Sequence, residues 1–235
     1  MSDYTLNIFT NAHETAPSPL MVQKTYKSFC DTFGHVKPII WVDPHPNVKH
    51  ARKYIQNLRN QFSDVRETKS LSDGYVRSIR ECETDYLFQL EGDWVFNREH
   101  ITHGLDEILQ QMSDRQIYHF RFNKRENKIA VWDKKMDAVD APVPYCISNN
   151  LSNNPHIICR KVYRQYGLIE VIKILPGSKG IEECLNSYSD THGDEDLYSA
   201  VYGPAGHPAT ITHLDGQGNR PSKKRPTIYK RSRLI

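Results

Sequence analysis

The sequence predicts an α/β fold in which a mixed, mostly parallel central sheet is covered by helices on both faces. In the first half of the chain, short apolar runs alternate with segments whose apolar residues recur at helical spacing. Strands that alternate with helices form right-handed crossover units, and these units build parallel sheets. The length of 235 residues, with 38% hydrophobic and 25% charged residues, suits one α/β domain with a substantial core.

The first two strand–helix units are the clearest part of this pattern. Tyr4 to Thr10 is expected to form a strand, and Pro17 to Phe33 a helix. Val36 to Val42 is a compact apolar strand, and a second helix follows from Asn47, whose side chain can cap it. The apolar faces of the two helices consist of Val22, Tyr26, Phe29 and Phe33, and of Val48, Ala51, Ile55, Leu58 and Phe62.

A third unit leads to the most polar strand end of the chain. A short strand from Val65 to Thr68 precedes a helix that begins at Ser70 or Ser72 and ends near Cys82. The apolar strand from Tyr86 to Leu90 then completes the alternating half of the sequence.

The pattern changes after a helix that is expected to begin at Asn97, with Ile101, Leu105, Ile108 and Met112 on its buried face. Ile117 to Phe122 and Ile129 to Trp132 are expected to pair as antiparallel strands across the polar turn Asn123 to Lys128. The segment from Asp140 to Pro155 is rich in proline and asparagine, which predicts irregular structure. Helical pieces are expected at Arg160–Tyr166, Gly180–Tyr188 and Asp194–Tyr202.

Cysteine usage and hydropathy predict the environment of the protein. The five cysteines are scattered and never form a Cys-x-x-Cys pair, which is typical of reduced thiols rather than of a disulfide framework or a zinc site. The N-terminal residues do not resemble a signal peptide, and no apolar stretch approaches the ~20 residues that span a bilayer. We therefore expect a soluble, cytoplasmic protein without a transmembrane segment.

Two carboxylates follow the apolar strand that ends at Leu90. Glu91 and Asp93 are separated by Gly92, so hard oxygen ligands lie at the end of a buried strand. Such ligands suit a divalent cation that also contacts phosphates, and ligands bind at strand ends in α/β proteins. The pair therefore predicts a metal–diphosphate site, although an acidic, solvated turn is the simpler interpretation of the pair alone.

A second acidic block lies in the segment from His192 to Ala200. Asp194, Glu195 and Asp196 are expected at the N-terminus of a helix, where backbone N–H groups and the helix dipole favour an ionised carboxylate. An ionised carboxylate can accept the proton of an attacking hydroxyl. Ordinary N-capping explains one such acid but not readily all three.

The two acidic blocks carry a resemblance to a known family. Gly74 to Phe96 resembles the central block of the GT-A fold nucleotide-sugar glycosyltransferases, the inverting family with an Asp-x-Asp motif, although Glu91 stands in place of the usual first Asp. The second block resembles the motif that supplies the catalytic base of that family, which here implies Asp196 or Glu195. The resemblance also implies a Mn²⁺ or Mg²⁺ ion held by Asp93 and Glu91. A late histidine is a common further ligand there, which makes His213 the first candidate and His207 the second.

The resemblance further implies where the nucleotide of a UDP- or GDP-type sugar donor binds. Thr10 and Asn11 follow the first strand and are expected to contact the base and ribose. Asp43 follows the second strand and can accept a hydrogen bond from a base N–H, or it can cap the Pro-His-Pro turn after it. Arg77 is expected to approach the base or phosphates, or to pair with a surface acid such as Glu81.

The end of the chain is strongly basic, with seven cations and no acid from Arg220 to Arg233. One interpretation is a lid in which a residue such as Lys224 neutralises the departing diphosphate. Another is a contact with nucleic acid or anionic lipid, since basic clusters serve both. A solvated terminal segment is the simplest of the three.

These observations together predict a single GT-A-like domain over residues 1–235. Residues 1–115 would form the nucleotide-binding half, 116–219 the acceptor and catalytic half, and 220–235 a basic tail. The expected activity is metal-dependent transfer of a sugar from a nucleoside-diphosphate sugar to a carbohydrate or other hydroxyl acceptor, with inversion. A sugar nucleotidyltransferase is disfavoured because the first strand is not followed by a Gly-rich loop. Action on nucleic acid through the tail is the other alternative.

Overall fold

The computed structural model describes residues 3–11, 19–43, 48–131, 133–172, 180–192 and 199–214. Its helices are α1 (Leu20–Phe33), α2 (Val48–Arg59), α3 (Leu71–Glu81), the 3₁₀ turn η1 (Arg98–His100), α4 (Leu105–Asp114), α5 (Arg160–Gln165), α6 (Leu168–Val171) and α7 (Ile181–His192). Its strands are β1 (Tyr4–Asn11), β2 (Ile39–Asp43), β3 (Asp64–Glu67), β4 (Tyr86–Glu91), β5 (Trp94–Phe96), β6 (His119–Arg121), β7 (Asp137–Val139), β8 (Tyr145–Ser148), β9 (His156–Cys159), β10 (Ser199–Tyr202) and β11 (Ile211–His213).

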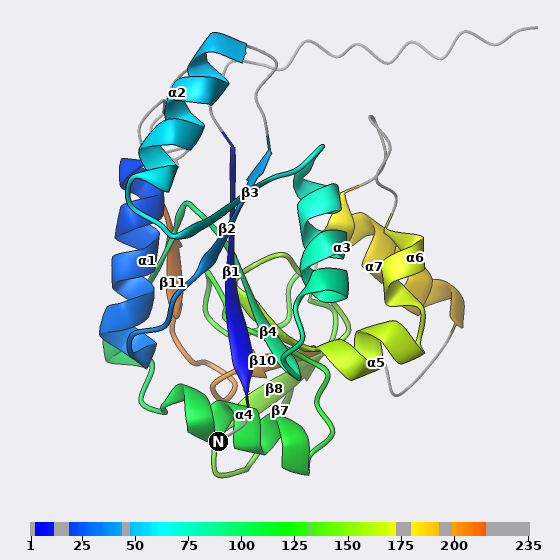
Figure 1. Cartoon of the computed structure of the whole chain (residues 1–235). Coiled ribbons are helices and arrows are strands. Elements are labelled where there is room, and N and C mark those ends of the chain that lie inside the picture. The colour runs from blue at the N-terminus through cyan, green and yellow to red at the C-terminus, as the bar shows by residue number, and fades with distance from the viewer. Residues whose placement is uncertain are drawn as a thin grey trace, which may run out of the picture.

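These strands form one large mixed sheet and one small sheet (Figure 1). The large sheet has the order β3-β2-β1-β4-β9-β6-β10-β8-β7, and the small one pairs β11 with β5. The first four strands of that order are parallel, as their alternation with helices predicted. Antiparallel β9 then separates β4 from β6, and β10 runs parallel to β6 and antiparallel to β8. The expected mixed α/β class is therefore confirmed.

Helices pack on both faces of the large sheet (Figure 1). Alternation along β1 divides the core, because Leu6 and Ile8 pack with α1, α2 and α4, whereas Phe9 packs with α3, α5, α6 and α7. The phenyl ring of Phe29 in α1 meets Phe88 of β4 edge to face at 5.0 Å between ring centroids. Within the ranges described above, no helix is both long enough and apolar enough to cross a bilayer.

Several sequence-based element predictions are wrong in the second half. The expected strand from Ile129 to Trp132 is not present at 129–131, where the side chains of Ile129 and Val131 are 71% and 79% exposed. Ser199–Tyr202 is strand β10 rather than the end of a helix, and Tyr145–Ser148 is strand β8 within the segment expected to be irregular. The helix expected from Asn97 begins at Leu105, after strand β5 and the 3₁₀ turn.

Candidate functional site

Three neighbouring parallel strands bring four of the predicted site residues to one edge of the sheet. Asn11 of β1 lies in register with Asp43 of β2, and the residue before Thr10 lies in register with Glu91 at the end of β4. Open α/β sheets bind ligands outside the carboxyl ends of their strands. The predicted location of Thr10, Asn11, Asp43 and Glu91 is thus the observed one, and their contacts with a donor stay a prediction.

Gly92 allows β4 to turn sharply between the two carboxylates. Its N–H donates a hydrogen bond of 2.7 Å to the carbonyl of Phe9 on β1. A Cβ atom at this position would lie 3.0 Å from Val22 Cγ2 of α1 and 3.3 Å from the Phe9 carbonyl oxygen. A side chain here would require Val22 or β1 to shift by a few tenths of an ångström, and the close approach that glycine allows sets Asp93 immediately beyond the edge of the sheet.

His213 meets Asp93 although 119 intervening positions separate them in the sequence. The Nε2 atom of His213 lies 2.9 Å from Oδ2 of Asp93. Strand β11 pairs antiparallel with β5, which sets His213 opposite Trp94 with 4.3 Å between the ring centroids, and the Leu214 N–H donates to the Asp93 carbonyl at 2.6 Å. The fold therefore brings these two predicted metal ligands together, and their binding of a metal stays a prediction. His207, the second candidate, instead donates from Nε2 to the His100 carbonyl at 2.8 Å.

Lys124 and Tyr54 belong to this site and were not predicted from the sequence. The Nζ atom of Lys124 lies 5.6 Å from the centre of the Trp94 ring, and its charge acts to lower the pKa of Glu91. The Tyr54 hydroxyl of α2 lies 2.6 Å from the hydroxyl of Thr10. Burial, and to a smaller extent the charge of Asp93, raise the pKa of Tyr54. Neither residue belongs to a recognisable sequence motif. Lys124 lies in the polar segment after β6, and Tyr54 has the helical spacing of an ordinary core aromatic residue.

The Glu91 carboxyl experiences a strongly unfavourable environment for its charge. Burial, followed by the charges of Asp93 and Glu182, raises the pKa of Glu91 to about 8, and Lys124 opposes that shift. A buried carboxyl whose pKa is raised beside a second carboxylate is characteristic of a position at which positive charge from a ligand is favourable.

This raised pKa predicts how stability depends on pH. The unfolded chain loses the Glu91 proton near the ordinary value of 4.5, whereas the folded chain holds it to about 8, so Glu91 destabilises the fold progressively across that window. We expect the unfolding free energy of Glu91→Gln, relative to that of the natural protein, to rise with pH by at most about 1.4 kcal/mol per pH unit between pH 4.5 and about 8. Above that range the difference between the two proteins should be constant. Urea titrations from acid to mildly alkaline pH measure this, and parallel curves for the two proteins would contradict it.

The donor set fits a divalent cation in part. Asp93 supplies a carboxylate and His213 an imidazole that are already in contact, and Glu91 is a carboxylate whose ionisation a nearby cation would favour. In the described portion of the chain, however, no three His, Cys, Asp or Glu side chains converge into a metal cluster. Water and phosphate oxygens would have to complete the coordination, as is usual for Mg²⁺.

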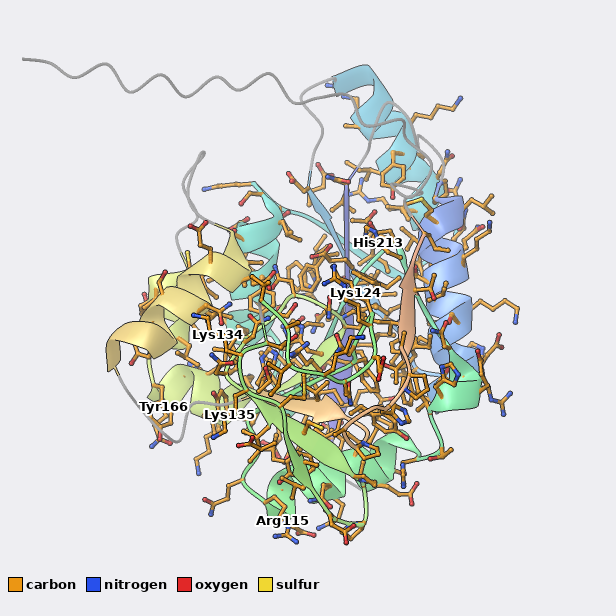
Figure 2. All side chains as sticks on the ribbon, turned by 180° about the vertical axis from the view of Figure 1, so that it is seen from behind. Arg115, Lys124, Lys134, Lys135, Tyr166 and His213 are labelled. Carbon is orange, nitrogen blue, oxygen red and sulfur yellow. The ribbon has the colours of Figure 1, made fainter. Side chains whose placement is uncertain are left out.

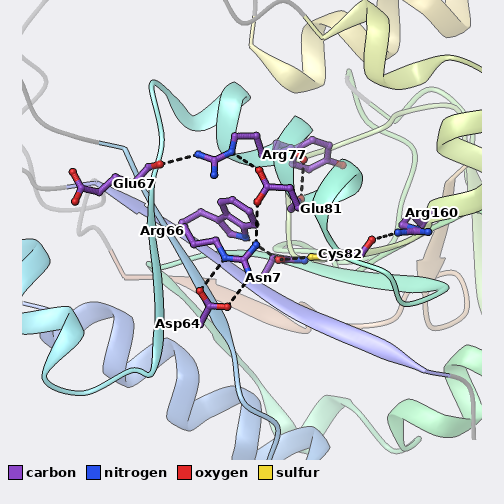
Figure 3. Close-up of polar contacts among 11 residues, drawn as sticks. Asn7, Asp64, Arg66, Glu67, Arg77, Glu81, Cys82 and Arg160 are labelled. Atoms are coloured by element: carbon purple, nitrogen blue, oxygen red, sulfur yellow. Dashed lines mark hydrogen bonds and ion pairs between the residues drawn. The ribbon is translucent and has the colours of Figure 1, made fainter.

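Arg77 is engaged in a polar network on α3 (Figure 3). Its Nε donates to the Glu81 carboxylate at 2.7 Å, and its Nη1 donates to the backbone carbonyl of Glu67 at 2.8 Å. The guanidinium also lies over the ring of Trp41 at 5.3 Å, and Arg66 lies over the same ring at 5.0 Å. Of the two interpretations of Arg77, the pairing with Glu81 is the one observed. Glu195, Asp196 and Lys224 lie outside the described residues.

A wide cleft of about 1040 Å³ opens beside the carboxylates. Its lining includes Glu91, Trp94, Lys124 and His213 together with residues of the β8–β9 segment and of α7. Figure 2, which views the molecule from behind, labels Lys124 and His213 in the middle and Lys134 nearer to α7. The cleft therefore reaches the edge of the sheet at Glu91, and its volume is large enough for a small molecule.

Comparison with known proteins supports the fold. No protein-family model and no curated protein matches the sequence. Among solved structures, mouse xyloside xylosyltransferase 1 matches with a TM-score of 0.50 and 12% identity over 93% of this chain and 100% of that one. S. aureus TarS matches with a TM-score of 0.51 and 11% identity over 90% of this chain but only 36% of that one. CMP-2-keto-3-deoxy-manno-octonic acid synthetase in complex with CTP matches with a TM-score of 0.47 and 15% identity over 87% and 90%. The mixed sheet and the matches at 0.50 and 0.51 show that the chain has a GT-A-like fold.

Proposed function

We propose that this protein is a glycosyltransferase that moves a sugar from a nucleoside-diphosphate sugar to a hydroxyl acceptor. The observation that carries the proposal is the contact between Asp93, immediately after β4, and His213, from the distant strand β11. This pair lies beside Lys124 and the carboxyl ends of β1 and β4. A cation that can bind an anion and a carboxylate that can bind a metal are therefore close together at the sheet edge where α/β proteins bind ligands. The named xylosyltransferase among the fold relatives is consistent with this chemistry.

Each residue of the edge has a role in the proposal. Thr10, Asn11 and Asp43 would bind the base and ribose. Asp93 and His213, with Glu91, would hold Mn²⁺ or Mg²⁺, which when bound supplies Lewis-acid neutralisation of the diphosphate. Lys124 adds a fixed positive charge on the same side of the cleft, where negative charge develops on the leaving diphosphate.

The transfer step is a single displacement. The acceptor oxygen forms a bond to the anomeric carbon while the bond from that carbon to the diphosphate oxygen breaks, and the electron pair leaves with the diphosphate. The acceptor proton passes to the carboxylate proposed as base, Asp196 or Glu195. Attack from the face opposite the leaving group inverts the anomeric configuration.

The first test is thermal melting against UDP, GDP, CDP and TDP, each with and without Mn²⁺. A ligand at a hundredfold its dissociation constant adds about 2.7 kcal/mol to the stability of the folded state. We expect one nucleotide to raise the melting temperature with Mn²⁺ only, and we expect Asp93→Ala and His213→Ala to lose that shift. Asp31→Ala, on the exposed surface of α1, is the matched control that keeps it.

The outcome also separates the alternatives. Absence of a shift with every nucleotide would contradict the proposal. If a nucleoside triphosphate with a sugar phosphate yields a nucleotide sugar and pyrophosphate, the enzyme is a nucleotidyltransferase instead. Salt-sensitive duplex binding that disappears when residues 220–235 are deleted would favour action on nucleic acid.

A further inference from the structure

The segment between β8 and β9 forms a wall of the cleft that is rich in side-chain amides. Asn149, Asn150, Ser152, Asn153 and Asn154 from this segment all line the cleft. We call residues 149–154 the amide wall. It faces the same space as Glu91 and His213, so a molecule lying against the wall would be next to the candidate donor site.

Buried side chains fix the backbone of the amide wall. The Asn150 N–H donates to Ser148 Oγ at 3.2 Å, and the Asn150 carbonyl accepts from Ser199 Oγ at 2.8 Å. The Asn154 carbonyl accepts from Nδ1 of His156 at 2.7 Å. Ser148, Ser199 and His156 are almost completely buried, so the wall is held in place before any ligand arrives.

Three of the four amides of the wall are not used to hold the fold together, whereas Oδ1 of Asn149 accepts a hydrogen bond from the Lys135 N–H at 3.2 Å. In the described ranges, the side chains of Asn150, Asn153 and Asn154 make no hydrogen bond to another residue. The amide of Asn186 in α7, which also lines the cleft, differs, because it accepts from the Leu151 N–H at 2.8 Å and donates to the Glu182 carbonyl at 2.8 Å. Each unused amide offers one acceptor and two donors, a combination that matches hydroxyl groups, which also both donate and accept.

Charge and shape narrow the class of ligand. Among the described residues that line the cleft, the cations Arg121, Lys124, Arg125 and Lys134 are nearly balanced by the acids Asp133, Glu182 and Glu183, whereas Glu91 holds its proton to about pH 8. The balance favours a neutral ligand over a polyanion. Val131 stands at the same cleft with 79% of its side chain exposed, and such an aliphatic group can pack on the C–H face of a sugar ring.

From these observations we infer that the amide wall binds the acceptor, and that the acceptor is a neutral polyhydroxylated compound such as a mono- or oligosaccharide. The inference rests on the proposed function, since it assigns the second substrate of that reaction. It assigns recognition to Asn150, Asn153 and Asn154, none of which belongs to the acidic motifs.

The test is saturation-transfer NMR on the full chain, with and without the nucleotide found by melting. The probes are the methyl glycosides of glucose, galactose, mannose, xylose and N-acetylglucosamine, the corresponding disaccharides, and a sulfated disaccharide. We expect at least one neutral probe to bind, with affinity unchanged between about 0.05 and 0.5 M NaCl. We expect Asn153→Ala and Asn153→Asp each to weaken it about tenfold, which corresponds to about 1.4 kcal/mol. Asn60→Ala, at the exposed end of α2, is the control without effect.

The readouts distinguish failure of this inference from failure of the proposed function. The nucleotide-induced melting shift reports the donor site, and we expect both Asn153 variants to retain it, which also shows that they fold. A normal nucleotide shift with no neutral probe bound overturns the inference alone. Preferred, salt-sensitive binding of the sulfated probe, or unchanged binding in both Asn153 variants, overturns the inference in the same way. Absence of the nucleotide shift in the natural protein overturns the proposed function.

Discussion

Asp133→Ala is expected to lower the free energy of unfolding by about 3–5 kcal/mol, because it leaves a buried guanidinium without its counter-ion. Arg121 of β6 is 1% exposed and pairs with Asp133, which is 14% exposed. The same guanidinium donates to Ser199 Oγ and Ser148 Oγ at 3.2 Å each, and Ser148 donates to Asp133 at 2.8 Å. Burial lowers the pKa of Arg121 and the charge of Asp133 opposes this shift, so the pair compensates a strong desolvation. Urea unfolding followed by circular dichroism measures the loss.

A matched control and a rescue make this expectation specific. Lys135→Ala removes one side of an exposed pair with Asp137, whose side chains are 53% and 62% exposed, and should change stability by less than about 0.5 kcal/mol. Replacing both buried partners, as Arg121→Met with Asp133→Leu, should recover most of the stability, because no charge is then left buried. A loss below about 1 kcal/mol for Asp133→Ala would contradict the prediction.

In the proposed sugar transfer, Lys124→Met is expected to slow the reaction by about 10²–10³-fold, the usual effect of removing one group that stabilises developing negative charge. The change keeps an unbranched side chain of similar length but removes the charge beside Glu91 and Trp94. The effect should fall mainly on kcat, because the leaving diphosphate gains charge only as its bond to the sugar breaks. Steady-state kinetics with the sugar nucleotide of the base identified by melting measures it.

The control for Lys124 is Lys134→Met. Lys134 is an exposed cation that lines the same cleft, so its replacement changes the net charge of the cleft equally. It should alter kcat by less than about threefold, in line with the small effects of exposed charges. Equal losses of kcat in the two variants would show that only the net charge of the cleft affects the rate, and they would remove Lys124 from the proposed site.

The alternating half of the fold could be predicted from the sequence because each strand there is a short apolar run between amphipathic helices. The strand ending at Glu91 was recognisable for the same reason, since its residues 86–90 are all buried. The position of His213 was also predictable, because it ends a short apolar strand near the second acidic block. The pairing of β11 with β5 places it 2.9 Å from Asp93, and the shared metal ligation expected of the two residues stays a prediction.

The second half was harder to predict because its short apolar runs do not reveal their surroundings. All four residues of β10 are buried, which gives the run no periodicity to tell a strand from a helix. Ile129 and Val131 alternate with other residues as a half-buried strand would, yet both are exposed, and Val131 lines the cleft. Lys124 lies over Trp94, and Asp133 pairs with the buried Arg121. Both contacts join segments that are apart in the sequence, so local patterns do not reveal them.

The small sheet of β5 and β11 has a consequence for the dynamics of the site. Only three residue pairs join these strands, and the large sheet does not include them. Local opening of β11 would thus separate His213 from Asp93 while the nine-stranded sheet stayed intact. Amide hydrogens of 211–214 should therefore exchange long before those of β1 and β4, and a bound ligand that contacts both residues would slow that exchange.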